Sequence, residues 1–201
     1  VWSPWPAPIL TVEHLLARGD YDELVAITLF HRIVEFVPGL SPVLTRYFGH
    51  STPELRSVAG LTEMMRQGKV QILGTVPEGR SCAYSFDEPV GPFTKYGLMV
   101  AALDADADIV LTAQKGVEHF GVHLRLPFDL SLPLPNRPKG LQVPVWYPGR
   151  RAHITLRYGR YQPRMTAAER QQLDPAARRA QLAEEFSAIH AELTRLYDEI
   201  P

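Results

Sequence analysis

The sequence predicts an α+β fold with a largely antiparallel sheet, and three observations support this class. Helical periodicity occurs towards both ends of the chain, whereas residues 70–158 consist mainly of short apolar runs separated by turn residues. The 18 prolines argue against a helical bundle. A hydrophobic fraction of 45% and a balance of 21 Lys and Arg against 22 Asp and Glu are ordinary for a globular domain.

Three helices are expected in the first half of the chain. Residues 21–36 carry apolar side chains at helical spacing. A second helix is expected from 53 to 68, because Ser51 and Glu54 have the spacing of a capping box. A third, over 93–103, is expected to face the sheet.

Strands and C-terminal helices follow from the same patterns. The strands are expected at 70–76, 81–86, 108–112, 121–127, 143–147 and 151–158, with an irregular connection over 130–140. Thr166 and Glu169 form a second capping box, and Asp174-Pro175 marks a fresh helix start. Beyond it, apolar residues step by 4, 3, 4 and 3 along one stripe, which predicts a core face or else a surface for a protein partner; they are Leu182, Phe186, Ile189, Leu193 and Leu196.

We expect one domain over residues 11–201, preceded by an extended arm over 1–10. The sequence contains no run of about 18 apolar residues, so no membrane span is expected. The single cysteine, Cys82, forms neither an internal disulfide nor a multi-cysteine zinc site, which fits a cytoplasmic protein. His119 and His123 share a strand face without a third ligand in view, so no metal site is expected.

Positive charge is concentrated between residues 137 and 164, a segment without Asp or Glu. Its cations are Arg137, Lys139, Arg150, Arg151, Arg157, Arg160 and Arg164. Such a segment favours phosphate groups, and Arg151, Arg157 and Arg160 are the candidate phosphate ligands. The alternative is a solvated surface whose compensating acids, such as Asp104, Asp106 and Asp108, lie nearby in the fold.

Residues 151–158 alternate between polar and apolar types, so a strand here has two different faces. Arg151, His153, Thr155 and Arg157 share one face, and the residues between them form an apolar one. A histidine and a threonine two positions apart lie about 6–7 Å apart along a strand, close enough to contact one phosphate together.

The stretch His153-Ile-Thr-Leu156, preceded by Pro-Gly-Arg-Arg-Ala, resembles the second His-x-Thr-x motif of the 2H phosphoesterase superfamily. It is most similar to the 2′,3′-cyclic nucleotide 3′-phosphodiesterase branch, and residues 108–116 and 122–126 resemble the strands that precede this motif. The resemblance implies a bilobal fold with two such motifs facing each other across a cleft. It also implies hydrolysis of 2′,3′-cyclic phosphate ends of RNA or nucleotides without metal or cofactor, with His153 and Thr155 at the catalytic site.

Two segments compete for the first motif. His50 and Thr52 form the only other His-x-Ser/Thr pattern, although Pro53 follows at once. Residues 80–86 are the better strand, and there Ser81 and Ala83 would occupy the histidine and threonine positions. In the second case the motif is lost, and the domain becomes a nucleic-acid-binding module without turnover.

A different class of enzyme is suggested by the same histidine. The order of features here resembles that of the ADP-ribosyltransferase fold. Residues 46–52 are followed by an expected helix and then by Tyr84, which lies 34 residues after His50. That resemblance implies NAD as a ligand held by His50 and Tyr84. No Glu lies between Glu118 and Glu169 to serve as the catalytic acid of that family.

Overall fold

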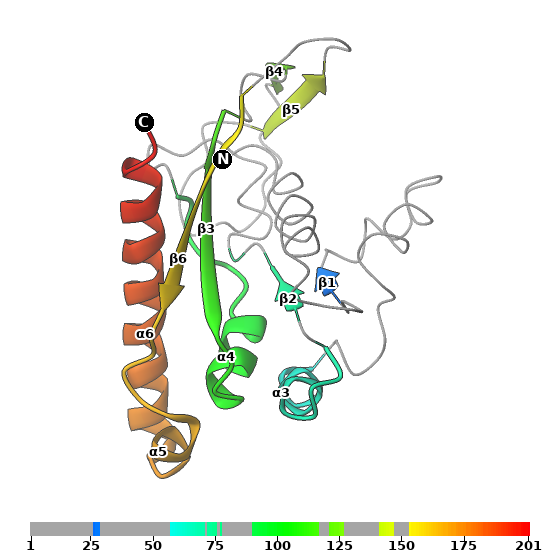
Figure 1. The fold of residues 1–201 in the computed structure, drawn as a ribbon. Helices are drawn as coiled ribbons and strands as arrows, with labels where there is room; N and C mark the ends of the chain where they lie inside the picture. Colours follow the sequence, from blue (N-terminus) through cyan, green and yellow to red (C-terminus); the bar gives the residue numbers. More distant parts are fainter. Residues whose placement is uncertain are drawn as a thin grey trace.

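The computed structural model describes residues 26–28, 57–70, 72–75, 77, 90–116, 121–126, 141–146 and 153–201. Their elements in chain order are β1 (Ala26–Thr28), α3 (Val58–Arg66), β2 (Ile72–Gly74), α4 (Gly97–Asp104), β3 (Ile109–Lys115), β4 (Gly121–Leu126), β5 (Leu141–Trp146), β6 (Thr155–Tyr161), α5 (Ala167–Gln171) and α6 (Pro175–Asp198). The fold is therefore α+β, as the sequence predicts (Figure 1).

The described strands form three two-stranded sheets. β3 pairs antiparallel with β6, β4 pairs antiparallel with β5, and β1 pairs in parallel with β2. The β3–β6 register runs from Ile109 opposite Tyr161 to Lys115 opposite Thr155. Antiparallel pairing thus holds for two of the three sheets, and the parallel pair departs from the expectation.

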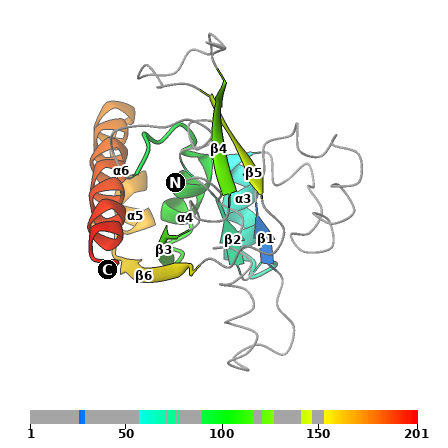
Figure 2. The same ribbon diagram turned by 90° about the horizontal axis from the view of Figure 1, so that it is seen from above.

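The long helix α6 covers one side of the β3–β6 sheet. It contacts both strands, and α4 packs against α3 and α5. Figures 1 and 2 show α6 running beside β3 and β6, with the short helix α5 near its N-terminal end. The carboxyl end of α6 therefore lies at the end of the sheet where β6 begins.

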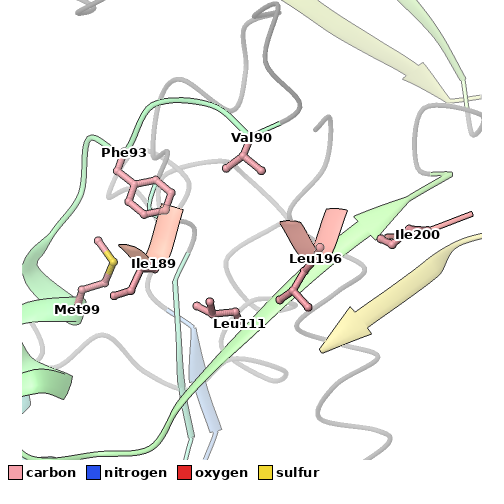
Figure 3. Close-up of a cluster of buried hydrophobic side chains, with 8 residues drawn as sticks. Val90, Phe93, Met99, Leu111, Ile189, Leu196 and Ile200 are labelled. Atoms are coloured by element: carbon pink, nitrogen blue, oxygen red, sulfur yellow. The ribbon is translucent and has the colours of Figure 1, made fainter. Parts of the chain in front are cut away.

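The main core lies between α6 and the β3–β6 sheet. Leu111 and Ala113 of β3 face Ile189 and Leu196 of α6, and Val90, Phe93, Met99 and Ile200 complete the buried cluster (Figure 3). Ile189 and Leu196 are only 1% and 2% exposed, while Phe186 and Leu193 pack against the cluster. The apolar stripe expected on this helix is therefore core.

The starts of both C-terminal helices are confirmed. The Thr166 side chain accepts a hydrogen bond from the Glu169 N–H, and the Glu169 carboxylate accepts one from the Thr166 N–H, completing the capping box of α5. Asp174 accepts hydrogen bonds from the backbone N–H groups of Ala176 and Ala177 at the start of α6. These bonds hold the pKa of the Asp174 carboxyl below its usual value.

Two N-terminal expectations are wrong. The expected helix over 21–36 contains β1, whose Ile27 and Thr28 are β-branched and whose parallel partner is β2. A short apolar run fits both periods, and pairing with a distant strand decides between them. The second helix begins later than expected, at Val58, because Ser57 is its N-cap and accepts a bond from the Gly60 N–H. Ser51 and Glu54, the expected capping box, lie outside the described residues. Its end near Gly68, which has a φ of +63°, agrees with the prediction.

The other boundaries shift by a few residues. The third helix begins at Gly97 rather than at residue 93, β3 extends three residues beyond the expected strand end, and β6 spans Thr155–Tyr161 instead of 151–158. The shift of β6 follows from its pairing along the whole of β3. The expected strand over 81–86, the connection over 130–140 and the arm over 1–10 lie outside the described residues.

Arginines from three other elements surround the carboxyl end of α4, which has no basic residue in its own last turn. Arg66 donates to the Asp104 carbonyl oxygen at 2.6 Å, and Arg178 pairs with the Asp104 carboxylate at 2.6 Å. Arg170 is completely buried and donates to the Leu103 carbonyl oxygen. Cations stabilise the carboxyl end of a helix, so these contacts tie α3, α5 and α6 to α4.

Candidate phosphate-binding end of the β3–β6 sheet

His153 and Thr155 lie where the chain enters β6, and both residues are exposed. Neither side chain has a hydrogen-bonding or ionic partner within the part of the chain that the structure describes. An exposed imidazole and hydroxyl at this spacing can both reach one phosphate group. His153 and Thr155, the strongest candidates from the sequence for a catalytic site, are therefore accessible to solvent at one end of the sheet.

The backbone of His153 passes close to Gly116, at the end of β3. Gly116 is buried and has a φ of +97°, a conformation that other residues rarely adopt. A Cβ atom at this position would overlap the carbonyl oxygen of His153. Gly116 therefore permits the close approach that sets the entry of the chain into β6.

The face of β6 that carries Thr155 and Arg157 is the one that meets α6. Arg157, Gly159 and Tyr161 face α6: a Cβ on Gly159 would lie 2.8 Å from Leu196 Cδ1, and the other two bond to helix side chains. Tyr158, on the face expected to be apolar, is 41% exposed. The polar face thus points at the helix, where Gly159 leaves room for Leu196 and where Arg157 and Tyr161 bond to carboxylates.

Two cations beside Thr155 are bound by the end of α6. Arg157 donates to the Glu199 carbonyl oxygen at 3.1 Å and pairs with its carboxylate at 2.6 Å. Lys115, directly opposite Thr155 in the register, donates to the Ile200 carbonyl oxygen at 2.5 Å and lies over the Tyr197 ring. The sheet-end cluster is defined as these two cations together with His153 and Thr155.

The two other described arginines of the basic segment also pair with carboxylates. Arg160 pairs with Asp108 at 2.5 Å, and Arg164 pairs with Glu184 at 3.5 Å. Both pairs are largely exposed, so each contributes little to stability. Asp108 is one of the acids that the alternative reading expected near the basic segment, whereas Asp104 and Asp106 pair with Arg178 and Arg170.

A buried carboxylate anchors the far end of β6. Glu185 is fully buried and accepts hydrogen bonds from the Tyr161 hydroxyl, the Arg164 backbone N–H at 2.9 Å and the Gln181 amide at 2.8 Å. Burial, followed by the hydrogen bond to Glu185 and its negative charge, raises the pKa of the Tyr161 phenol well above its usual value of 10.0. These hydrogen bonds fix the carboxyl end of β6 against α6. The sheet-end cluster lies at the opposite end of the strand.

Several predicted site residues lie outside the described residues. These are His50, Thr52, Ser81, Ala83, Tyr84 and Arg151. The structure therefore brings together His153, Thr155 and Arg157, and places Arg160 on the opposite face of the same strand. In the described ranges no three His, Cys, Asp or Glu residues are grouped as metal ligands, and none of the described helices is long and apolar enough to cross a membrane.

Sequence reasoning missed Lys115 and Glu199 as members of this region. Lys115 is 40 positions from Thr155 in the chain, and only the strand register makes them neighbours. Glu199 follows a helix whose apolar stripe predicts packing on a sheet but not which strand its end reaches. The lack of acids between 137 and 164 was the available signal that carboxylates must come from other elements.

The chain was compared with protein-family models, with curated proteins and with solved structures, and none of the three comparisons found a match.

Proposed function

We propose that the chain binds 2′,3′-cyclic phosphate ends of RNA or of nucleotides at the sheet-end cluster, and hydrolyses them if a second acid/base residue reaches the same phosphate. The observation that carries the proposal is the pair His153 and Thr155, exposed together at the entry of β6. The likeness of residues 153–156 to a 2H phosphoesterase motif supports the same substrate class.

The chemistry requires two proton transfers. A base removes a proton from water as the water oxygen forms a bond to phosphorus, and an acid protonates the ribose oxygen whose bond to phosphorus breaks. His153 serves as one of these groups, and Thr155 donates a hydrogen bond to a nonbridging oxygen. His50 is the proposed second histidine; if it is absent from the site, the domain binds its ligand without turnover.

Hydrolysis of a short RNA ending in a 2′,3′-cyclic phosphate tests this proposal. The assay contains EDTA and compares the unmodified chain with His153→Ala, Thr155→Val and His50→Ala. Turnover is expected to fall by at least about a hundredfold in His153→Ala, because general acid–base groups contribute about 10²–10⁴ to rates. Loss in His50→Ala as well identifies the second histidine.

Tyr158→Phe is the matched control, because Tyr158 is exposed on the opposite face of the same strand. Its turnover should equal that of the unmodified chain. Salt-sensitive binding without turnover, weakened by His153→Ala, would assign a binding module. If His153→Ala and Thr155→Val change neither turnover nor binding, the proposal is wrong.

A further inference from the structure

We propose that the turn after α6, formed by Glu199 and Ile200, is an internal competitor for the phosphate that the sheet-end cluster binds. This inference rests on the proposed function, because it concerns regulation of the same site. Glu199 offers a carboxylate to Arg157, and Ile200 offers a carbonyl oxygen to Lys115; these are the described cations on the face of Thr155.

The contacts of Glu199 resemble those of a bound anion. One carboxylate oxygen, Oε2, pairs with Arg157 at 2.6 Å, and the same guanidinium also donates to the Glu199 carbonyl oxygen at 3.1 Å. The other carboxylate oxygen pairs with Arg195. A phosphate beside Thr155 would present the same kind of acceptor to Arg157, so phosphate and Glu199 compete for one donor.

Lys115 is held in the same way on the neighbouring strand. Its register partner is Thr155, and its ammonium group is held at 2.5 Å from the Ile200 carbonyl oxygen and 5.0 Å from the centre of the Tyr197 ring. Lys115 and Arg157, the described cations on the face of Thr155, are thus bound by consecutive residues at the end of α6. Release of this turn would free two positive charges at the proposed site.

The solvent exposure of these contacts makes the exchange feasible. The side chains of Arg157 and Glu199 are 47% and 35% exposed, so water screens their attraction. A phosphate beside Thr155 can gain bonds from His153 and Thr155, which the Glu199 carboxylate does not make. Ligand binding is therefore expected to displace the carboxylate from Arg157.

The test measures the affinity of the full chain for a short RNA with a 2′,3′-cyclic phosphate end, under EDTA and with His153→Ala as the reference for specific binding. Glu199→Gln is expected to bind about two- to fivefold more tightly than the unmodified chain, because the value of one exposed ion pair is of this size. Glu199→Ala provides a second variant, and urea unfolding confirms that each variant is folded.

Glu192→Gln is the matched control. It removes one negative charge and one partner of Arg195, as Glu199→Gln does, but Glu192 makes no described contact with Arg157. Its affinity should equal that of the unmodified chain. The double variant Glu199→Gln with Arg157→Leu should bind no more tightly than Arg157→Leu alone. The reason is that Arg157 is the donor that Glu199→Gln releases.

The outcomes separate this inference from the proposed function. If His153→Ala abolishes binding but Glu199→Gln binds no more tightly than the unmodified chain, the site stands and the internal competitor is refuted. An equal gain in Glu192→Gln also refutes it, because general charge would then explain the effect. If binding is absent, or indifferent to His153→Ala, the proposed function fails and this inference fails with it.

Discussion

Gly159 determines how closely α6 approaches β6. A Cβ at this position would lie 2.8 Å from Cδ1 and 3.2 Å from Cδ2 of Leu196, a side chain that is only 2% exposed. Gly159→Ala is therefore expected to lower the free energy of unfolding by about 1–3 kcal/mol, as overpacking in a core does. Urea denaturation followed by circular dichroism measures this difference.

Gly97 provides the contrast for this prediction. It begins α4, and a Cβ there would lie 3.7 Å from Val58, an ordinary contact. Gly97→Ala should leave the free energy of unfolding unchanged or raise it by up to about 1 kcal/mol, because alanine favours helix. Equal losses in the two variants would contradict the packing described at Gly159.

The hydroxyl of Tyr161 gives the stability a defined pH dependence. Its pKa is raised in the folded chain by burial and by Glu185, so the folded state retains a proton that the unfolded state releases above about pH 10. The stabilisation is therefore complete below pH 10 and is lost as the pH rises beyond it. Tyr161→Phe should be less stable than the unmodified chain at pH 7, and the difference should shrink above pH 10. A constant difference from pH 7 to pH 11 would exclude this account.

At the scale of elements, a buried arginine joins α4 to α5. Arg170 is fully buried and lies 3.6 Å from the Asp106 carboxylate, whose Oδ1 also accepts a bond from the Ala167 N–H. Asp106 has a φ of +50°, which asparagine tolerates. Asp106→Asn thus removes the charge while keeping the backbone and an acceptor oxygen, and is expected to lower the free energy of unfolding by about 1–2 kcal/mol.

Asp108→Asn is the control for that measurement. It breaks the pair with Arg160, in which both side chains are mostly exposed. Its effect on the free energy of unfolding should stay below about 0.5 kcal/mol. Urea unfolding of both variants measures the two free-energy differences. A larger loss of stability in Asp108→Asn than in Asp106→Asn would contradict the stabilising role of the Arg170–Asp106 contact.

The elements also show what local sequence determines. Thr166 and Asp174 cap their own helices through bonds to residues two or three positions away, so the pattern alone predicts both starts. The face of β6 depends on contacts with Leu196 and Glu199, about 40 residues away. Gly159 has no side chain and Arg157 is polar, so the alternation identified the strand but did not indicate that this face meets α6.

At the scale of the whole molecule, the helix that builds the core also controls the charge of the candidate site. The apolar stripe of α6 packs on β3, and this packing carries its carboxyl end to the entry of β6. His153 and Thr155 could be identified from their spacing, whereas Lys115 and Glu199 required the register and the helix position. The basic segment of the sequence is therefore balanced, in its described part, by acids from other elements.

The central claim, that His153 and Thr155 contact a phosphate, is tested most directly by an NMR titration of the full chain with a 2′,3′-cyclic nucleotide. The imidazole resonances of His153 and the backbone amide of Thr155 should shift saturably and at the same ligand concentration. Those of His190, whose ring lies 5.0 Å from that of Phe93 in the core, should stay unchanged. Saturable shifts at His190 without any at His153, or no shifts at all, would contradict the account.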